Sequence, residues 1–143
     1  AIEYMKAYPD RFFLCQTKDP SCFYRYTFPD NVILAITLET NRAEQTQAIS
    51  KAPIPEFRFR QFLAYKHPLK IVTAEPILKF DLQTFATWLT KLKTGTEFYY
   101  VYIGYDNHNC HLDEPSLALT NTLIKRLEQA RIEVRRKNIR ESK

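Results

Sequence analysis

Five short apolar runs, separated mostly by segments of helical periodicity, constrain this chain more than any other feature of its sequence. The runs span residues 11–16, 31–39, 70–74, 98–104 and 132–136. Apolar residues repeat at helical spacing between the later runs, and we expect helices over residues 55–66, 81–92 and 115–127. Strands that alternate with helices usually pair in parallel through right-handed crossovers. The pattern therefore predicts an α/β domain of about five mainly parallel strands.

The length of the chain limits the number of strands and therefore decides whether the sheet can close into a complete barrel. The chain has 143 residues, which is enough for a single domain that spans residues 1–143. A complete eight-stranded barrel needs about 250 residues, so we expect a partial (β/α) barrel with its helices outside. A doubly wound open sheet is the alternative. The first residues already have helical character and lack an initiator Met, which suggests the carboxyl-terminal part of a larger barrel.

An incomplete barrel would expose strand edges and an apolar inner surface. We therefore expect a missing amino-terminal segment, a partner chain or self-association to cover them. No apolar run approaches the roughly 20 residues of a membrane span, so no membrane partner is expected. The three cysteines form too sparse a set for a disulfide framework, which favours a reducing, cytoplasmic setting.

Polar residues follow the apolar runs at the end where parallel α/β folds bind ligands. Because the carboxyl ends of parallel strands share one edge, these side chains are expected to converge on a polar small molecule. The alternative is that strand-to-helix loops are polar in any case and supply helix caps. The candidate binding residues are Gln16, Thr17, Lys18, Glu39, Asn41, Arg42, Glu75, Asp106 and Asn107.

Other motifs in the chain favour structural roles over catalysis. The segment 106–111 contains potential metal ligands but no paired motif elsewhere, which favours an exposed polar loop over a zinc site. Cys15 lies inside an apolar run and is expected in the core, as is Cys22. His67 is expected at the surface. Only two glycines are present, and neither lies in a glycine-rich phosphate-binding motif.

The carboxyl-terminal segment suggests a different function. Residues 122–143 carry eight basic and three acidic residues, which equals the whole net charge of +5. A basic tail of this kind binds phosphate in some proteins and is a solvated helix end in many others. Nucleic-acid binding or protein interaction through this tail is therefore the alternative function. Its candidate residues are Arg135, Arg136, Lys137 and Arg140.

Several strings in the chain resemble the later strands of a radical-SAM-like family. This family has phage-associated members and is distantly similar to spore photoproduct lyase. The distinctive features are T-K-x-P, E-x-N-R and E-P-I-L at strand ends, in the same order along the chain. The strings are FLCQTKDP (13–20), PDNVILAITLETNR (29–42), ISKAP (49–53), IVTAEPILKFDL (71–82) and VYIGYDN (101–107).

The resemblance implies a partial (β/α) barrel that holds S-adenosylmethionine beside a [4Fe–4S] cluster. It also implies that the candidate binding residues of the strand ends face the cofactor and substrate cavity. The family binds its cluster through a CxxxCxxC motif in its amino-terminal part, and this sequence has no such motif. The chain is therefore expected to be the substrate- and cofactor-side portion of a radical-SAM-type enzyme. It should be inactive alone, because reductive cleavage of the cofactor needs an electron from iron–sulfur.

Overall fold

The five strands form one parallel sheet in the computed structural model, which describes all 143 residues. Their order along the sheet follows their order in the chain, and every neighbouring pair is parallel. The predicted parallel α/β architecture is therefore confirmed. The strands are β1 (Phe13–Thr17), β2 (Val32–Thr37), β3 (Leu69–Ala74), β4 (Phe98–Gly104) and β5 (Glu133–Lys137).

Helical segments connect or flank all of the strands. Pro20 and Pro55 each occupy the first turn of their helix, where the missing proline N–H costs nothing. None of the helices has the length and apolar character that a membrane span requires. The helices are α1 (Ile2–Ala7), α2 (Ala43–Gln47), α3 (Pro55–Ala64), α4 (Leu82–Lys91) and α5 (Leu117–Gln129), and η1 (Pro20–Arg25) is a 3₁₀ helix.

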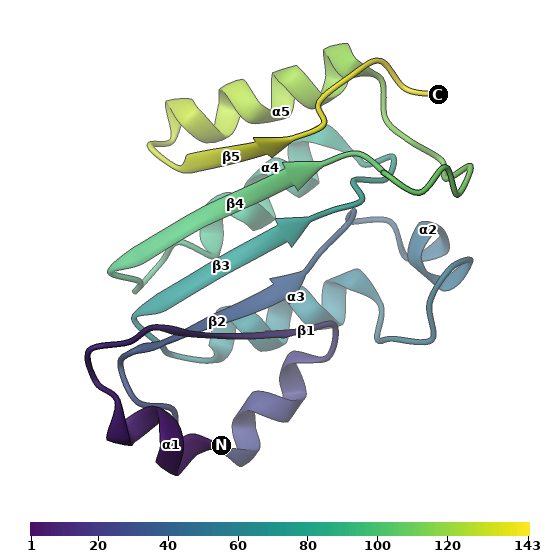
Figure 1. Cartoon of the computed structure of the whole chain (residues 1–143). Helices are drawn as coiled ribbons and strands as arrows, with labels where there is room; N and C mark the ends of the chain where they lie inside the picture. The colour runs from purple at the N-terminus through teal and green to yellow at the C-terminus, as the bar shows by residue number, and fades with distance from the viewer.

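The sequential strand order has a direct consequence for the two faces of the sheet. Right-handed crossovers between adjacent strands place all of their helices on the same side. Figure 1 shows α3 and α4 behind the sheet and no helix over its near face. Doubly wound sheets reverse their strand order at a switch point, and this sheet has no reversal. The sequential order is the one expected of a partial barrel, and the face of the sheet without a helix over it is here called the open face.

The hydrophobic core lies between the sheet and the helices. Alternate residues of β2, β3 and β4 point to this side, because successive side chains of a strand face opposite ways. Leu34, Val72 and Val101 of these strands are fully buried. They belong to the same core cluster as Phe62 of α3 and Phe85 of α4, both also fully buried. The residues between them in the same strands face the other way, toward the open face.

Two local expectations need correction. His67 is buried rather than at the surface, because its Nε2 lies 2.6 Å from the Val32 carbonyl oxygen and its ring packs edge-on against Phe28. The last helix begins after Ser116 and not at Pro115, since the Ser116 hydroxyl accepts the Leu119 N–H and caps the helix. The helix expected over residues 81–92 is α4, and Asp81 stands at its N-cap without a capping bond from its side chain.

Candidate functional site

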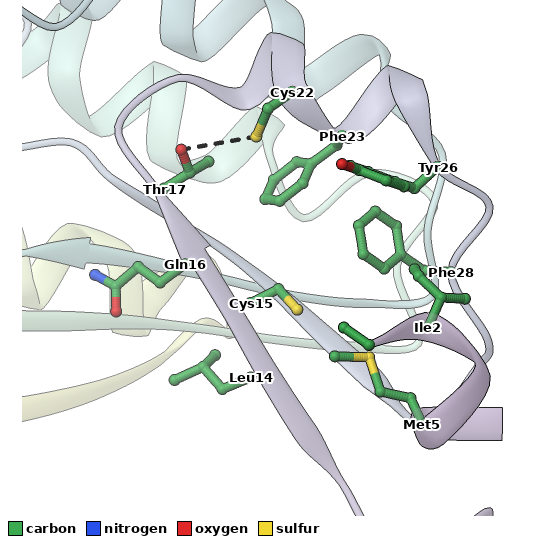
Figure 2. Close-up of a pocket in the computed structure, with 11 residues that line it drawn as sticks. Ile2, Met5, Leu14, Cys15, Gln16, Thr17, Cys22, Phe23, Tyr26 and Phe28 are labelled. Atoms are coloured by element: carbon green, nitrogen blue, oxygen red, sulfur yellow. Dashed lines mark hydrogen bonds between the residues drawn. The ribbon is translucent and has the colours of Figure 1, made fainter. Parts of the chain in front are cut away.

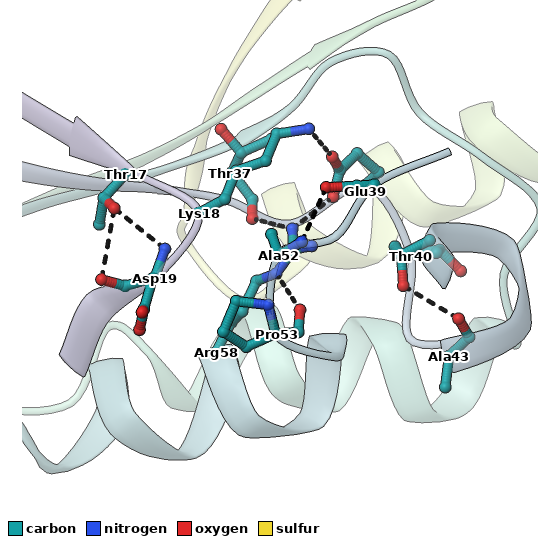
Figure 3. A network of polar contacts seen from close by, with 12 residues as sticks. Thr17, Lys18, Asp19, Thr37, Glu39, Thr40, Ala43, Ala52, Pro53 and Arg58 are labelled. Atoms are coloured by element: carbon teal, nitrogen blue, oxygen red, sulfur yellow. Dashed lines mark hydrogen bonds and ion pairs between the residues drawn. The ribbon is translucent and has the colours of Figure 1, made fainter. Parts of the chain in front are cut away.

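The carboxyl ends of β1 and β2 meet at a buried carboxylate. Glu39 is fully buried just beyond β2, and one of its oxygens accepts a hydrogen bond from Lys18 Nζ at 2.6 Å. The other oxygen accepts from Arg58 Nη1 of α3 at 2.8 Å. Figure 3 shows the three side chains meeting between the strand ends and the helix. Parallel pairing therefore brings Lys18 and Glu39 together, as expected, but around an arginine that the sequence pattern did not single out.

Arg58 is itself fully buried and ties α3 to the sheet. Its Nη1 also donates to the Thr37 carbonyl at 3.0 Å, and its Nε donates to the Pro53 carbonyl at 2.6 Å. Its Nη2 is buried and has no hydrogen-bond partner. A buried carboxylate needs such partners, because an unpaired charge in a protein interior is strongly destabilising. Both oxygens of Glu39 are thus engaged within the fold, and neither is free for a ligand.

Asn41 and Arg42 bind a neighbouring loop instead of a shared cavity. Asn41 Nδ2 donates to one oxygen of Asp81 at 3.0 Å, and Arg42 Nη2 donates to the other at 2.7 Å. The Asp81 N–H in turn donates to Asn41 Oδ1 at 2.8 Å. Hydrogen bonds from Arg42 and then Asn41 lower the pKa of Asp81. These contacts join the loop after β2 to the start of α4.

Asp106 and Asn107 organise the loop that follows β4. The Asp106 carboxylate accepts the backbone N–H groups of Cys110 at 2.6 Å and His108 at 2.9 Å. These two bonds lower the pKa of Asp106. Asn107 pairs with the side chain of Asn138, just beyond β5. Both residues therefore stabilise a polar, largely exposed loop, in agreement with the structural interpretation of residues 106–111.

Gln16 and Thr17 point to opposite sides of β1. Gln16 Nε2 donates to the Thr37 hydroxyl at 3.0 Å. Gln16 also lines a hollow of about 230 Å³ together with residues of β3 and β4. Thr17 packs on the opposite side, where its hydroxyl accepts the Asp19 N–H at 2.9 Å. Of these two residues, only Gln16 reaches the open face.

Glu75 is the candidate that best fits an accessible ligand site. It follows β3, lines the same hollow and forms an ion pair at 3.0 Å with Lys137 of β5. The hydrogen bond from Lys137 to Glu75 raises the pKa of the lysine. This close packing depends on Gly104, since a Cβ there would lie 2.9 Å from the Lys137 carbonyl and 3.2 Å from Glu75 Cδ. The hollow is lined by Leu14, Gln16, Ile71, Thr73, Glu75, Tyr100 and Tyr102.

The four candidate nucleic-acid-binding residues of the carboxyl-terminal segment are each paired with a carboxylate. Their partners are Glu133 for Arg135, Glu128 for Arg136, Glu75 for Lys137 and Glu114 for Arg140. Arg135 also stacks over the ring of Tyr100, with its Cζ 3.8 Å from the ring centre. The four residues do not form one unpaired basic surface. Nucleic-acid binding through them stays a prediction with no added support.

The cysteines do not provide a site for an iron–sulfur cluster. Cys15 and Cys22 line a groove beside β1, whereas Cys110 is exposed in the loop after β4. Burial, and then the neighbouring Cys22, raise the pKa of the Cys15 thiol, which disfavours the thiolate that binds metal. No group of three or more His, Cys, Asp or Glu side chains is arranged to hold a metal ion. Residues 1–143 by themselves therefore do not fit a [4Fe–4S] cluster.

Sequence reasoning missed two parts of this region. Arg58 lies between two phenylalanines in a helix and looked like an ordinary solvent-facing residue. Tyr100 and Tyr102 were assigned to a buried strand, although their alternation along β4 already placed them on one common face. No family model matches the chain, and no curated protein or solved structure matches it either. The resemblance to radical-SAM-like proteins therefore stays a prediction.

Proposed function

We propose that this chain is the substrate- and cofactor-side portion of a radical-SAM-type enzyme, with its binding surface on the open face of the sheet. The observation that carries the proposal is the sequential parallel sheet with one uncovered face. Such a sheet is the inner wall of a partial barrel, and α/β barrels bind their ligands at the carboxyl ends of the strands. Glu75 and Lys137 lie at that end, beside Tyr102 and Gln16.

The chemistry of these residues suits S-adenosylmethionine. A carboxylate and an ammonium side by side match the amino and carboxylate groups of an amino-acid zwitterion. Tyrosine rings on the same face attract a cationic sulfonium and pack against a purine. In such enzymes the cofactor supplies a radical once an iron–sulfur cluster reduces it. The cluster would have to come from outside residues 1–143, because the cysteines of this chain do not form its site.

The proposal narrows the set of residues that would contact the cofactor. Glu75, Lys137 and Gln16 face the hollow or its rim, where they would bind and orient polar groups. Glu39 is held by Lys18 and Arg58 and would act indirectly, by fixing the strand ends that form the rim. Asn41 and Arg42 are engaged with Asp81 and would keep the loop after β2 in place.

Titration of the unaltered chain with S-adenosylmethionine tests the proposal. Calorimetry should detect binding, and NMR should show shifts of the Thr73, Tyr100 and Tyr102 amides. Replacing Glu75 with glutamine should weaken binding about tenfold, because one charge-assisted hydrogen bond is lost. Glu56→Gln is the matched control, since Glu56 is exposed on α3 and pairs only with Arg60.

Two results would contradict the proposal. The first is the absence of any heat or amide shift with the folded chain. The second is equal affinity of the unaltered chain and the Glu75→Gln variant, which would remove Glu75 from the binding surface even if the cofactor bound elsewhere.

A further inference from the structure

The two edges of the sheet are very different in character. β5, at one edge, reads EVRRK and carries a charge at every position except Val134. β1, at the other edge, reads FLCQT and has neither a charge nor a proline. Proteins protect free strand edges with charges and prolines, because unpaired backbone groups otherwise recruit other strands. The β5 edge is protected in this way, and the β1 edge is not.

Backbone hydrogen-bonding groups are available along the β1 edge. The Phe13 N–H donates to the Asn31 carbonyl at 3.0 Å, toward β2. Successive residues of a strand direct their N–H and C=O groups to opposite sides, so those of Leu14 and Gln16 face away from β2. Leu14 is also 56% exposed, an unusual value for a leucine in a sheet. The edge therefore offers both donors and acceptors beside apolar surface.

An apolar groove of about 620 Å³ runs beside the same strand, between α1 and η1. Figure 2 shows Met5 of α1 on one side of it, Phe23 and Phe28 on the other, and Cys15 of β1 between them. Nine of its 11 lining residues are hydrophobic. A strand added at the β1 edge would place alternate side chains on this side of the sheet, so apolar residues at every second position would fill the groove.

A second copy of this chain is a poor occupant of the groove. Phe13 and Cys15 of β1 already pack against their own core, and the exposed Leu14 faces the open side of the sheet, so another β1 has no free apolar side chain to insert into the groove. β5 has the same limitation, because Val134 packs inward and Arg136 pairs with Glu128 of α5. The occupant has to bring apolar side chains that are not already buried in its own fold.

We propose that the β1 edge is a docking site for an extended strand of a partner polypeptide with aliphatic side chains at every second position. The strand adds to the sheet by hydrogen bonds to Leu14 and Gln16 and fills the groove between α1 and η1. This is the strand-addition mode of recognition, in which the backbone provides affinity and the groove provides selectivity. The proposal does not depend on cofactor binding, because it rests on the backbone groups of the β1 edge and on the groove between α1 and η1, although the side chains of Leu14 and Gln16 also line the hollow beside Glu75.

Short peptides provide the test. The probes are acetylated and amidated peptides in which valine or isoleucine alternates with threonine or lysine, titrated into isotope-labelled chain. Binding should shift the Leu14 and Gln16 amide signals and slow their hydrogen exchange. The Leu14→Pro variant should bind about tenfold more weakly, because it loses a donor at the free edge and none toward β2. Leu14→Ala keeps the amide and should bind within about threefold of the unaltered chain.

Control peptides and the oligomeric state of the chain provide results that could overturn the docking proposal. Peptides with proline at every position that faces β1 lose the N–H groups directed at that edge and should not bind. Equal shifts with the proline peptides, or no shift with any aliphatic probe, would overturn the proposal. So would a dimer by light scattering whose Leu14 and Gln16 amides are already protected. If circular dichroism shows that Leu14→Pro does not fold, the peptide titration of the unaltered chain decides alone.

Discussion

Replacing Arg58 with methionine is expected to lower the free energy of unfolding by about 3–5 kcal/mol. Arg58 and Glu39 are both fully buried and lie 2.8 Å apart, so the change leaves a buried carboxylate without its main partner. Lys18 remains, but its side chain is 41% exposed and is partly solvated. Urea denaturation followed by Trp88 fluorescence would measure the loss, because Trp88 stacks on Phe59 in the folded chain.

The same helix supplies a matched control. Arg60 is exposed and pairs with Glu56 one turn away, so Arg60→Met should cost less than about 1 kcal/mol. A double variant with Glu39→Leu and Arg58→Met should recover much of the lost stability, because apolar residues often replace a buried ion pair without net cost. Equal losses for Arg58→Met and Arg60→Met would show that the buried pair does not stabilise this fold.

The double variant also separates two roles for Glu39. The sequence placed Glu39 among the residues that contact a cofactor, whereas its contacts are all within the fold. If the double variant folds and binds S-adenosylmethionine as the unaltered chain does, the role of Glu39 is structural. If binding is lost in the folded double variant, Glu39 contributes to the site despite its burial.

The strands were predictable because apolar runs identify buried segments locally. Residues 98–104 have the expected bounds, and the alternation of strands with helices indicated parallel pairing. The open face was harder to predict, because its residues include Ile71 and Ala35, which are as apolar as the core side of the same strands. An apolar run shows that a strand is present but does not show whether one face or both are covered.

The candidate site was less predictable, because polarity at a strand end does not specify a partner. Arg42 and Glu75 look alike in the sequence, as charged residues that follow apolar runs. Arg42 binds Asp81, 39 residues further along the chain, while Glu75 faces the open hollow. Arg58 could not be identified for a related reason. Its role depends on Glu39, which comes from another element, and helical periodicity carries no information on that contact.

The second large effect is expected at Lys70, whose titration makes the free energy of unfolding depend on pH. It is 2% exposed within β3, and its ammonium donates to the Phe62 carbonyl at 2.6 Å and lies over the Phe62 ring. Burial lowers the pKa of Lys70 from 10.5 to about 8. Burial thus disfavours the charged form, and the hydrogen bond to Phe62 offsets only part of that cost.

The direction of the pH effect depends on whether the folded or the unfolded chain binds the Lys70 proton more tightly. Between about pH 8 and 10.5 the unfolded chain retains the proton on Lys70 and the folded chain releases it. The free energy of unfolding therefore rises with pH in this window, by about 2–3 kcal/mol from pH 7 to pH 10 for this group. Below about pH 8 the full cost of the buried ammonium is present.

Comparison with Lys70→Met isolates this contribution. Burial also raises the pKa of Tyr99, which lowers stability at alkaline pH, but this effect is common to both proteins and cancels in their difference. Urea unfolding at pH 7, 8, 9 and 10 should show that the free energy of unfolding of the unaltered chain increases relative to that of Lys70→Met as the pH rises. Lys91→Met, an exposed change on α4, should show no such trend. A constant difference between Lys70→Met and the unaltered chain at every pH would mean that Lys70 keeps its proton in the fold as readily as in the unfolded chain.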